Sequence, residues 1–205
     1  MNNPVKGMVW KDYPAGNITQ WFGENPTLYA PLKMLGHNGV DIVAPWGTPI
    51  LATTSQKVVE VKDTAGGYGK HVRCLDAERE YVYGHLSAIT VKLGDQLAEG
   101  MQIGLMGNTG FVVSGSTPYW KYNPYAGTHL HYGERMLSSS APLNIHYSTG
   151  DSRQVLNYDN GYFGSVDPRF KSETPEQKLQ ALLTIASLMN QVLVLLGKIR
   201  LFKGR

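Results

Sequence analysis

The chain has 205 residues, which is enough for one domain with a sizeable core and a short appendage. Its 23 glycines and 12 tyrosines favour a β-rich fold with many turns, and its net charge of +3 supports only a weak attraction to an anionic polymer. Lysine and arginine form no dense cluster, so we expect no nucleic-acid partner. The single cysteine, Cys74, is expected to be a buried thiol without chemistry.

The first 35 residues are expected to be irregular apart from a strand over Ile18–Gly23. Pro26, Pro31 and the glycines around them argue against a helix in this part of the chain. The first residues also lack the charged start and apolar run of a secretory signal, so action outside the cytoplasm would need another route. Val40–Ile50, with two prolines and a glycine, is typical of a strand, a tight turn and a second strand.

Three segments in the middle of the chain alternate β-branched with polar residues: Lys57–Asp63, Lys70–Asp76 and Glu80–His85. This alternation predicts a meander of antiparallel strands. Residues 111–126 form a long aromatic connection, which fits equally the rim of a substrate groove and a loop that packs its own rings. We therefore predict a mainly β, antiparallel fold.

The last thirty residues differ in character from the rest of the chain. Thr174, Pro175 and Glu176 mark a helix start, and apolar positions then recur every three or four residues in two adjacent stripes. We predict one main domain over residues 1–170 and a C-terminal amphipathic, apolar α-helix within 171–205. Two adjacent stripes favour self-association or pairing with a partner helix, and the flanking basic residues keep contact with an anionic membrane surface as the alternative.

Four residues carry the pattern expected of a metal site. His37 and Asp41 are four apart, and an imidazole nitrogen and a carboxylate oxygen are both zinc ligands. A third ligand is available ninety residues later, where His129 and His131 point to the same face if they lie on a strand. The alternative arrangement is a three-histidine site formed by His129, His131 and one distant histidine, although it leaves Asp41 without a role.

Several short stretches, in this order, resemble the M23 zinc metallopeptidases, the lysostaphin-like cell-wall endopeptidases. The matching stretches lie within residues 17–136 and are Trp21–Gly23, Gly36–Asp41, Ala44–Pro49, Tyr83–Ser87, Gly107–Gly110 and His129–His131. Residues 137–170 look similar to phage-encoded members of the family. One departure is Gly133, which stands between Tyr132 and Glu134 where the family usually has an acid directly after the aromatic residue.

The resemblance implies an antiparallel β fold with a narrow groove and Zn²⁺ on its floor. Carried over by position, His37, Asp41 and His131 would be the metal ligands, and His85 and His129 the unliganded catalytic pair. Zinc would lower the pKa of a water molecule, one histidine would take its proton, and the other would stabilise the oxyanion or protonate the leaving amine.

The function implied by the resemblance is that of a zinc-dependent endopeptidase that hydrolyses peptide bonds in the stems or cross-bridges of bacterial peptidoglycan. Such a protein would act at the bacterial cell wall, as a bacteriophage endolysin released on lysis or as part of a virion. The alternative from another class is a non-catalytic M23-like module that binds or activates a partner, or a structural component of a virion. Metal content distinguishes these two readings, because non-catalytic modules typically lose metal ligands.

Overall fold

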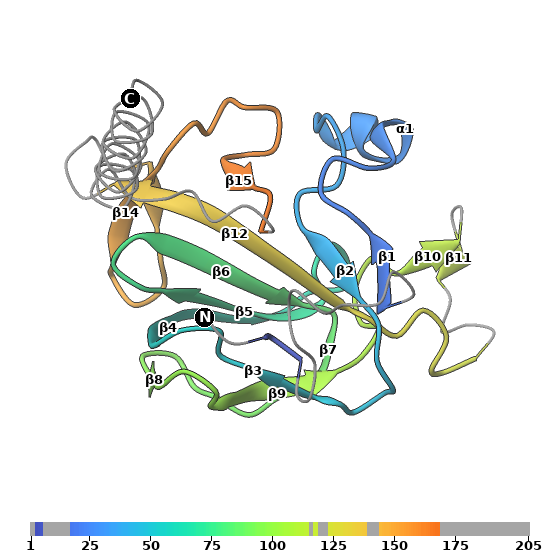
Figure 1. The fold of residues 1–205 in the computed structure, drawn as a ribbon, viewed down its shortest axis with the longest axis horizontal. Helices are drawn as coiled ribbons and strands as arrows, with labels where there is room; N and C mark the ends of the chain where they lie inside the picture. The colour runs from blue at the N-terminus through green and yellow to red at the C-terminus, as the bar shows by residue number, and fades with distance from the viewer. Residues whose placement is uncertain (1–2, 6–16, 115–116, 119–122, 139–143, 169–205) are drawn as a thin grey trace, which may run out of the picture. The chain divides into compact units, whose positions relative to one another are not determined.

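Strands dominate the computed structural model, which describes residues 3–5, 17–114, 117–118, 123–138 and 144–168 (Figure 1). The strands are β1 (Ile18–Gln20), β2 (Val40–Ile42), β3 (Pro49–Leu51), β4 (Gln56–Asp63), β5 (Lys70–Leu75), β6 (Arg79–Gly84), β7 (Leu86–Ile89), β8 (Gln96–Leu97), β9 (Gln102–Met106), β10 (Val113–Ser114), β11 (Thr117–Pro118), β12 (Leu130–Ser138), β13 (Ile145–His146), β14 (Ser152–Val155) and β15 (Ser165–Val166). The predicted meander corresponds to β4, β5 and β6.

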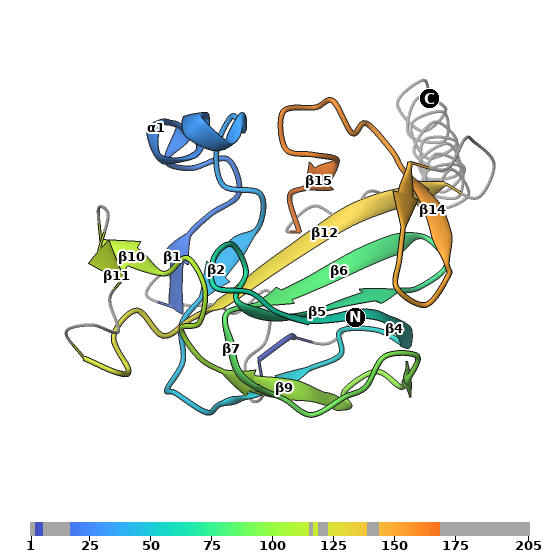
Figure 2. The same ribbon diagram turned by 180° about the vertical axis from the view of Figure 1, so that it is seen from behind.

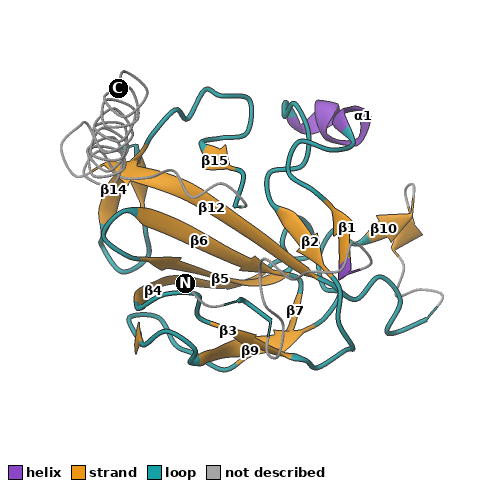
Figure 3. Ribbon diagram, in the orientation of Figure 1, coloured by secondary structure: helices purple, strands orange, loops and turns teal. Residues whose placement is uncertain are grey.

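Most strands belong to one large sheet with the order β1-β2-β12-β6-β5-β4-β8, to which β13, β14 and β15 are joined beyond β12. A smaller sheet has the order β3-β9-β7, and β10 and β11 form a separate pair. Each of these strand pairs is antiparallel, and strands are the prevailing element in Figure 3. The predicted mainly β, antiparallel fold is therefore confirmed.

The main core lies between the two sheets. The rings of Tyr81, Tyr83 and Tyr132 come from the large sheet and are almost fully buried, as are Ile50 and Ile103 from the small sheet. Burial of an apolar side chain of this size stabilises the fold by about 1.5–3 kcal/mol. In both views, β3 and β9 lie on the opposite side of β4, β5 and β6 from α1 (Figures 1 and 2).

The cysteine behaves as its sequence context predicts. Cys74 lies on β5 and its side chain is fully buried in the same core. Burial raises the pKa of its thiol above the ordinary value, and the charge of Glu80 acts in the same direction. The thiol therefore stays protonated and serves as a small apolar side chain.

The expectation that no helix occurs in the first 35 residues is wrong. A short helix, α1 (Pro26–Tyr29), continues into the 3₁₀ turn η3 (Ala30–Leu32). Pro26 occupies the first helical turn, where its missing N–H would have no intrahelical partner in any case, so proline starts this helix instead of preventing it. None of the seven residues in α1 and η3 is buried.

Two sequence-based predictions fall outside the described residues. These are the helix predicted within 171–205, with its self-association, and the part of the aromatic connection that holds Tyr119, Trp120 and Tyr122. The described elements belong to one compact unit, Met1–Arg169, and the division into residues 1–170 and 171–205 stays a prediction. Within the ranges that the structure describes, no helix has the length and apolar character needed to cross a bilayer.

Candidate metal centre and active site

Three neighbouring strands bring the predicted site residues together. Asp41 on β2 is the direct cross-strand partner of His131 on β12, and His131 is in turn opposite Gly84 on β6. Facing positions on antiparallel strands hold their Cβ atoms about 4.5–5.5 Å apart, so strand register alone places Asp41 beside His131. His37 lies just before β2, and His129 precedes β12 by one residue.

The nearest atoms of three of these side chains form a compact triangle. His37 Nε2 is 2.9 Å from His131 Nδ1 and 3.1 Å from Asp41 Oδ1, and the third side, between His131 Nδ1 and Asp41 Oδ1, measures 3.2 Å. All three residues are buried, with 1%, 8% and 3% exposure for His37, Asp41 and His131. They are the group of metal-ligating side chains found among the described residues.

Hydrogen bonds among the three side chains cannot pair all the polar atoms of this triangle. His37 Nδ1 lies 3.3 Å from the carbonyl oxygen of Trp21, and donation to that oxygen leaves Nε2 as a bare acceptor in the neutral ring. His131 Nδ1 can donate to only one of its two neighbours, and its buried Nε2 has no partner among the described residues. His37 Nε2, His131 Nδ1 and Asp41 Oδ1 can all act as acceptors and face one another within hydrogen-bond distance. Three such atoms together fit a shared cation.

The protonation states of the ligands also suit a metal. Burial lowers the pKa of His131 to about 4 despite its hydrogen bond with Asp41, so the ring is neutral at pH 7. Burial opposes ionisation of Asp41, but its neighbours His129, His131 and His37 hold its pKa well below the ordinary value. Metal binding requires neutral imidazole and ionised carboxylate, which is the combination found here.

The size of the triangle matches zinc. The centre of a triangle with sides of 2.9, 3.1 and 3.2 Å lies about 1.8 Å from each corner. His37 Nε2, Asp41 Oδ1 and His131 Nδ1 are therefore close enough together to hold one zinc ion at its usual ligand distances of ~2.0–2.1 Å. The residues present fit a zinc ion with three protein ligands.

The two remaining histidines stand beside this triangle with fixed orientations. His85 Nδ1 lies 2.7 Å from the carbonyl oxygen of Thr109, and His129 Nδ1 lies 2.7 Å from that of Gly127. Donation from Nδ1 in each neutral ring leaves Nε2 free to accept a proton. The two ring centres are 4.6 Å apart, so both histidines can contact the same bound group.

The environments of these two histidines differ. Burial, followed by the charges of His129 and His131, lowers the pKa of His85 well below its ordinary value, so His85 is a neutral base at pH 7. His129 Nε2 instead lies 3.6 Å from Asp41 Oδ2 and so faces a carboxylate. His85 also has a positive φ of 61°, an uncommon backbone conformation for a residue with a side chain.

Sequence reasoning missed the aromatic and amide groups that surround the triangle. The Tyr68 ring packs against His131 with centroids 4.9 Å apart, and Tyr29 from α1 stacks on His37 at 5.5 Å. Asn38 Nδ2 donates to the Tyr68 hydroxyl at 2.7 Å. These groups fix the ligand rings in place, and only the position of Asn38 beside His37 gave any sequence signal.

Two cavities meet at the histidines and form the arms of one groove. One, of about 420 Å³, runs along the outer face of the large sheet past Tyr68, Val82 and Gly133. The other, of about 540 Å³, runs the opposite way past Gln20 and Thr128. Both are lined by His37, His85, His131, Tyr29, Leu32 and Phe111. The groove implied by the family resemblance is present. In the described part of the aromatic connection, Phe111 lines both cavities, whereas Tyr125 packs edge-on against Trp46.

An antiparallel β protein with a buried His₂Asp triangle, two free histidines and an open groove has the architecture of a metallopeptidase. A family model described as "Peptidase family M23" matches residues 35–144, slightly more than half of the chain. The chain belongs to peptidase family M23, as its sequence motifs indicate.

Individual relatives agree with this assignment. The chain is 30% identical to the glycyl-glycine endopeptidase ALE-1 of Staphylococcus capitis over 68% of this chain and 31% of the relative. It is 33% identical to the peptidoglycan DD-endopeptidase ShyA of Vibrio cholerae over 55% of this chain and 23% of the relative. The chain thus spans less than a third of the length of these relatives. The crystal structure of a mutant catalytic domain of the prophage-encoded M23 protein EnpA from Enterococcus faecalis is similar, with a TM-score of 0.51 and 26% identity over 78% of this chain and 95% of that domain.

Proposed function

We propose that this protein is a zinc-dependent endopeptidase that hydrolyses peptide bonds in peptidoglycan stems or cross-bridges. The observation that carries the proposal is the buried triangle of His37, Asp41 and His131 with the open nitrogens of His85 and His129 beside it. Peptide hydrolysis needs an activated water and a proton donor for the leaving amine, and this arrangement has a group for each task.

The five residues divide into two sets with separate roles. His37, Asp41 and His131 would hold Zn²⁺, which when bound supplies Lewis acidity toward a peptide carbonyl and toward water. His85, neutral in its buried position, accepts the proton of the attacking water on Nε2. His129, whose Nε2 faces the Asp41 carboxylate, carries the proton that stabilises the oxyanion and then reaches the leaving amine.

The three-histidine rival receives no support from the distances. His129 is not part of the group of ligating atoms that includes His37, Asp41 and His131, and its nearest ionic contact is with Asp41 at 3.6 Å. In this arrangement Asp41 has a role on both sides, as a ligand and as the partner of a protonated His129. A separate role for His129 is therefore the proposal that the geometry supports.

Peptidoglycan as substrate is supported by the relatives, whose names include a glycyl-glycine endopeptidase and a peptidoglycan DD-endopeptidase. The proposed place of action is accordingly the bacterial cell wall. A phage origin, with the protein carried in the virion or released on lysis as an endolysin, is supported by the similarity to a prophage-encoded domain. Detection of the protein in purified phage particles, or only in lysates, would test that part of the proposal.

The central experiment is digestion of purified peptidoglycan, with mass spectrometry of the fragments to identify the bond that is cut. We expect new peptide termini with the zinc-loaded protein, none after chelation, and recovery when zinc is added back. The His129→Ala variant should retain zinc but release no fragments. Absence of cleavage by the zinc-loaded protein, or absence of bound zinc, would favour the non-catalytic module.

A further inference from the structure

One arm of the groove carries positive charge on its wall. Among the described residues that line the 420 Å³ cavity, the charged side chains remote from the histidines are Arg73 on β5 and Arg135 on β12, and none is acidic. The opposite, 540 Å³ arm is lined by Asp41 and by no lysine or arginine within the described residues. The two arms of the groove therefore present different chemistry to a bound peptide.

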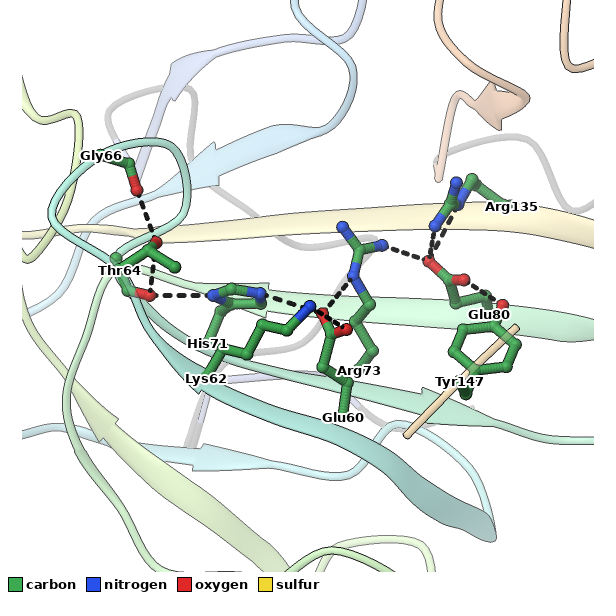
Figure 4. A network of polar contacts seen from close by, with 10 residues as sticks. Glu60, Lys62, Thr64, Gly66, His71, Arg73, Glu80, Arg135 and Tyr147 are labelled. Atoms are coloured by element: carbon green, nitrogen blue, oxygen red, sulfur yellow. Dashed lines mark hydrogen bonds and ion pairs between the residues drawn. The ribbon is translucent and has the colours of Figure 1, made fainter. Parts of the chain in front are cut away.

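A buried carboxylate holds both guanidinium groups in place (Figure 4). Glu80 is fully buried and accepts hydrogen bonds on Oε1 from Arg73 Nη1 and from Nε and Nη2 of Arg135, while Tyr147 donates to its Oε2. Arg73 Nε additionally donates to Glu60 Oε1 at 3.0 Å. Neither glutamate lines the cavity, so both carboxylates support the arginines from below the groove wall.

Each arginine keeps one terminal nitrogen outside this network. Within the described residues, Nη2 of Arg73 and Nη1 of Arg135 have no hydrogen-bond partner, and Figure 4 shows a terminal nitrogen of each pointing away from Glu80. The Arg73 guanidinium also lies 5.4 Å from the centroid of the Tyr68 ring, which limits its movement. A ligand carboxylate would meet two donors that are already oriented, which reduces the entropy lost on binding.

The strand register gives the distance from the metal centre to this pair. Along β12, Arg135 lies four residues after the proposed ligand His131, which corresponds to ~13 Å of extended strand. Gly133, between them on the same face, has no side chain, and so the floor of the arm stays open. A peptide laid over Gly133 spans this distance with three or four residues.

We propose that Arg73 and Arg135 form a subsite that binds a free carboxylate of the substrate, three or four residues from the bond that is cut. This inference rests on the proposed peptidase function and adds a substrate class to it: peptides that carry a carboxylate, as opposed to uncharged glycine bridges. Glu60 and Glu80 occupy Nε and Nη1 of Arg73 and Nε and Nη2 of Arg135, and the outward nitrogen of each guanidinium is available to a ligand.

The test compares two substrates that differ only in carboxylate charge. Cross-linked peptide fragments are released from peptidoglycan by a glycan-cleaving enzyme, and half are converted to carboxamides with carbodiimide and ammonia. We expect the wild-type, zinc-loaded protein to hydrolyse the native fragments with a kcat/KM about 10- to 100-fold higher than the amidated ones, chiefly through KM. Arg73→Gln and Arg135→Gln should remove this preference while amidated fragments are cut at the wild-type rate.

Lys62→Gln is the matched control, because it removes one positive charge from a half-exposed side chain that pairs with Glu60 and does not line the cavity. It should keep the full preference for native fragments. Equal hydrolysis of both substrates by the wild-type protein would overturn the subsite and leave the peptidase function intact. If neither substrate is hydrolysed, the peptidase function fails, and calorimetric binding of the two fragments decides the subsite: equal affinities would overturn it.

Discussion

Substitution of Gly39 by alanine tests whether the proposed metal centre depends on close packing behind a ligand. Gly39 precedes β2, and a Cβ added there would lie 2.6 Å from the carbonyl oxygen of Tyr132 and 2.7 and 2.8 Å from Cε1 and Nε2 of His131. Ordinary van der Waals contact starts at 3.4 Å, so the His131 ring must move by the difference between 3.4 and 2.7 Å, about 0.7 Å.

A displacement of this size exceeds the tolerance of ~0.2 Å in a metal–ligand distance. We expect Gly39→Ala to lower zinc affinity by about 10- to 100-fold, the range found when groups that orient a ligand are changed. The contact with the Tyr132 backbone also forces β2 and β12 apart, and overpacking of this kind costs about 1–3 kcal/mol of stability. For a domain of this size, the midpoint of thermal unfolding should fall by several degrees.

Zinc affinity is measured by competition with a chromophoric chelator, and stability by thermal unfolding of the metal-free protein. Gly66→Ala is the control, because a Cβ at Gly66 would meet nothing within 4 Å and the backbone there is not in the left-handed region. Wild-type zinc affinity in Gly39→Ala would refute the packing argument for His131. A variant that loses stability but binds zinc normally would show that the added Cβ displaces the backbone of β2 and β12 and leaves the His131 ring in place.

Three further results are expected. Asp41→Ala and His131→Ala should lose zinc whereas His129→Ala keeps it, and full metal loss from the purified His129→Ala variant would point to the three-histidine site. The pKa of Glu60 falls from an ordinary value of 4.5 to about 2, because hydrogen bonds and charge from its cationic neighbours outweigh burial. This stabilisation is complete above pH 4.5 and disappears as pH falls through 2, so Glu60→Gln should cost at most about 3 kcal/mol in urea unfolding at pH 7 and almost nothing near pH 2. Truncation after Phe170 should preserve zinc binding and hydrolysis but change the oligomeric state or membrane association, and identical light scattering and membrane flotation of both forms would contradict an assembly role.

The local sequence was sufficient to predict the central strands and to nominate the candidate site residues. Alternation of β-branched and polar residues fixes β4, β5 and β6, because successive side chains on a strand face opposite sides of the sheet. The same period of two places His129 and His131 on one face. The spacing of His37 and Asp41 and the chemistry of their side chains marked both as candidate ligands, and the resemblance to family M23 supplied the division of roles.

Tertiary structure alone decided how these atoms are arranged and what surrounds them. Pairing of β12 with β2 on one side and β6 on the other sets Asp41 beside His131, and no local pattern specifies which distant strands become neighbours. The positive φ of His85 follows from hydrogen bonds to remote backbone groups, which local propensity does not contain. Arg73 and Arg135 become one cluster because β6, which lies between their two strands, carries the buried carboxylate of Glu80, and both arginines pair with it. Within its own sequence segment, each of these three residues is an ordinary strand residue.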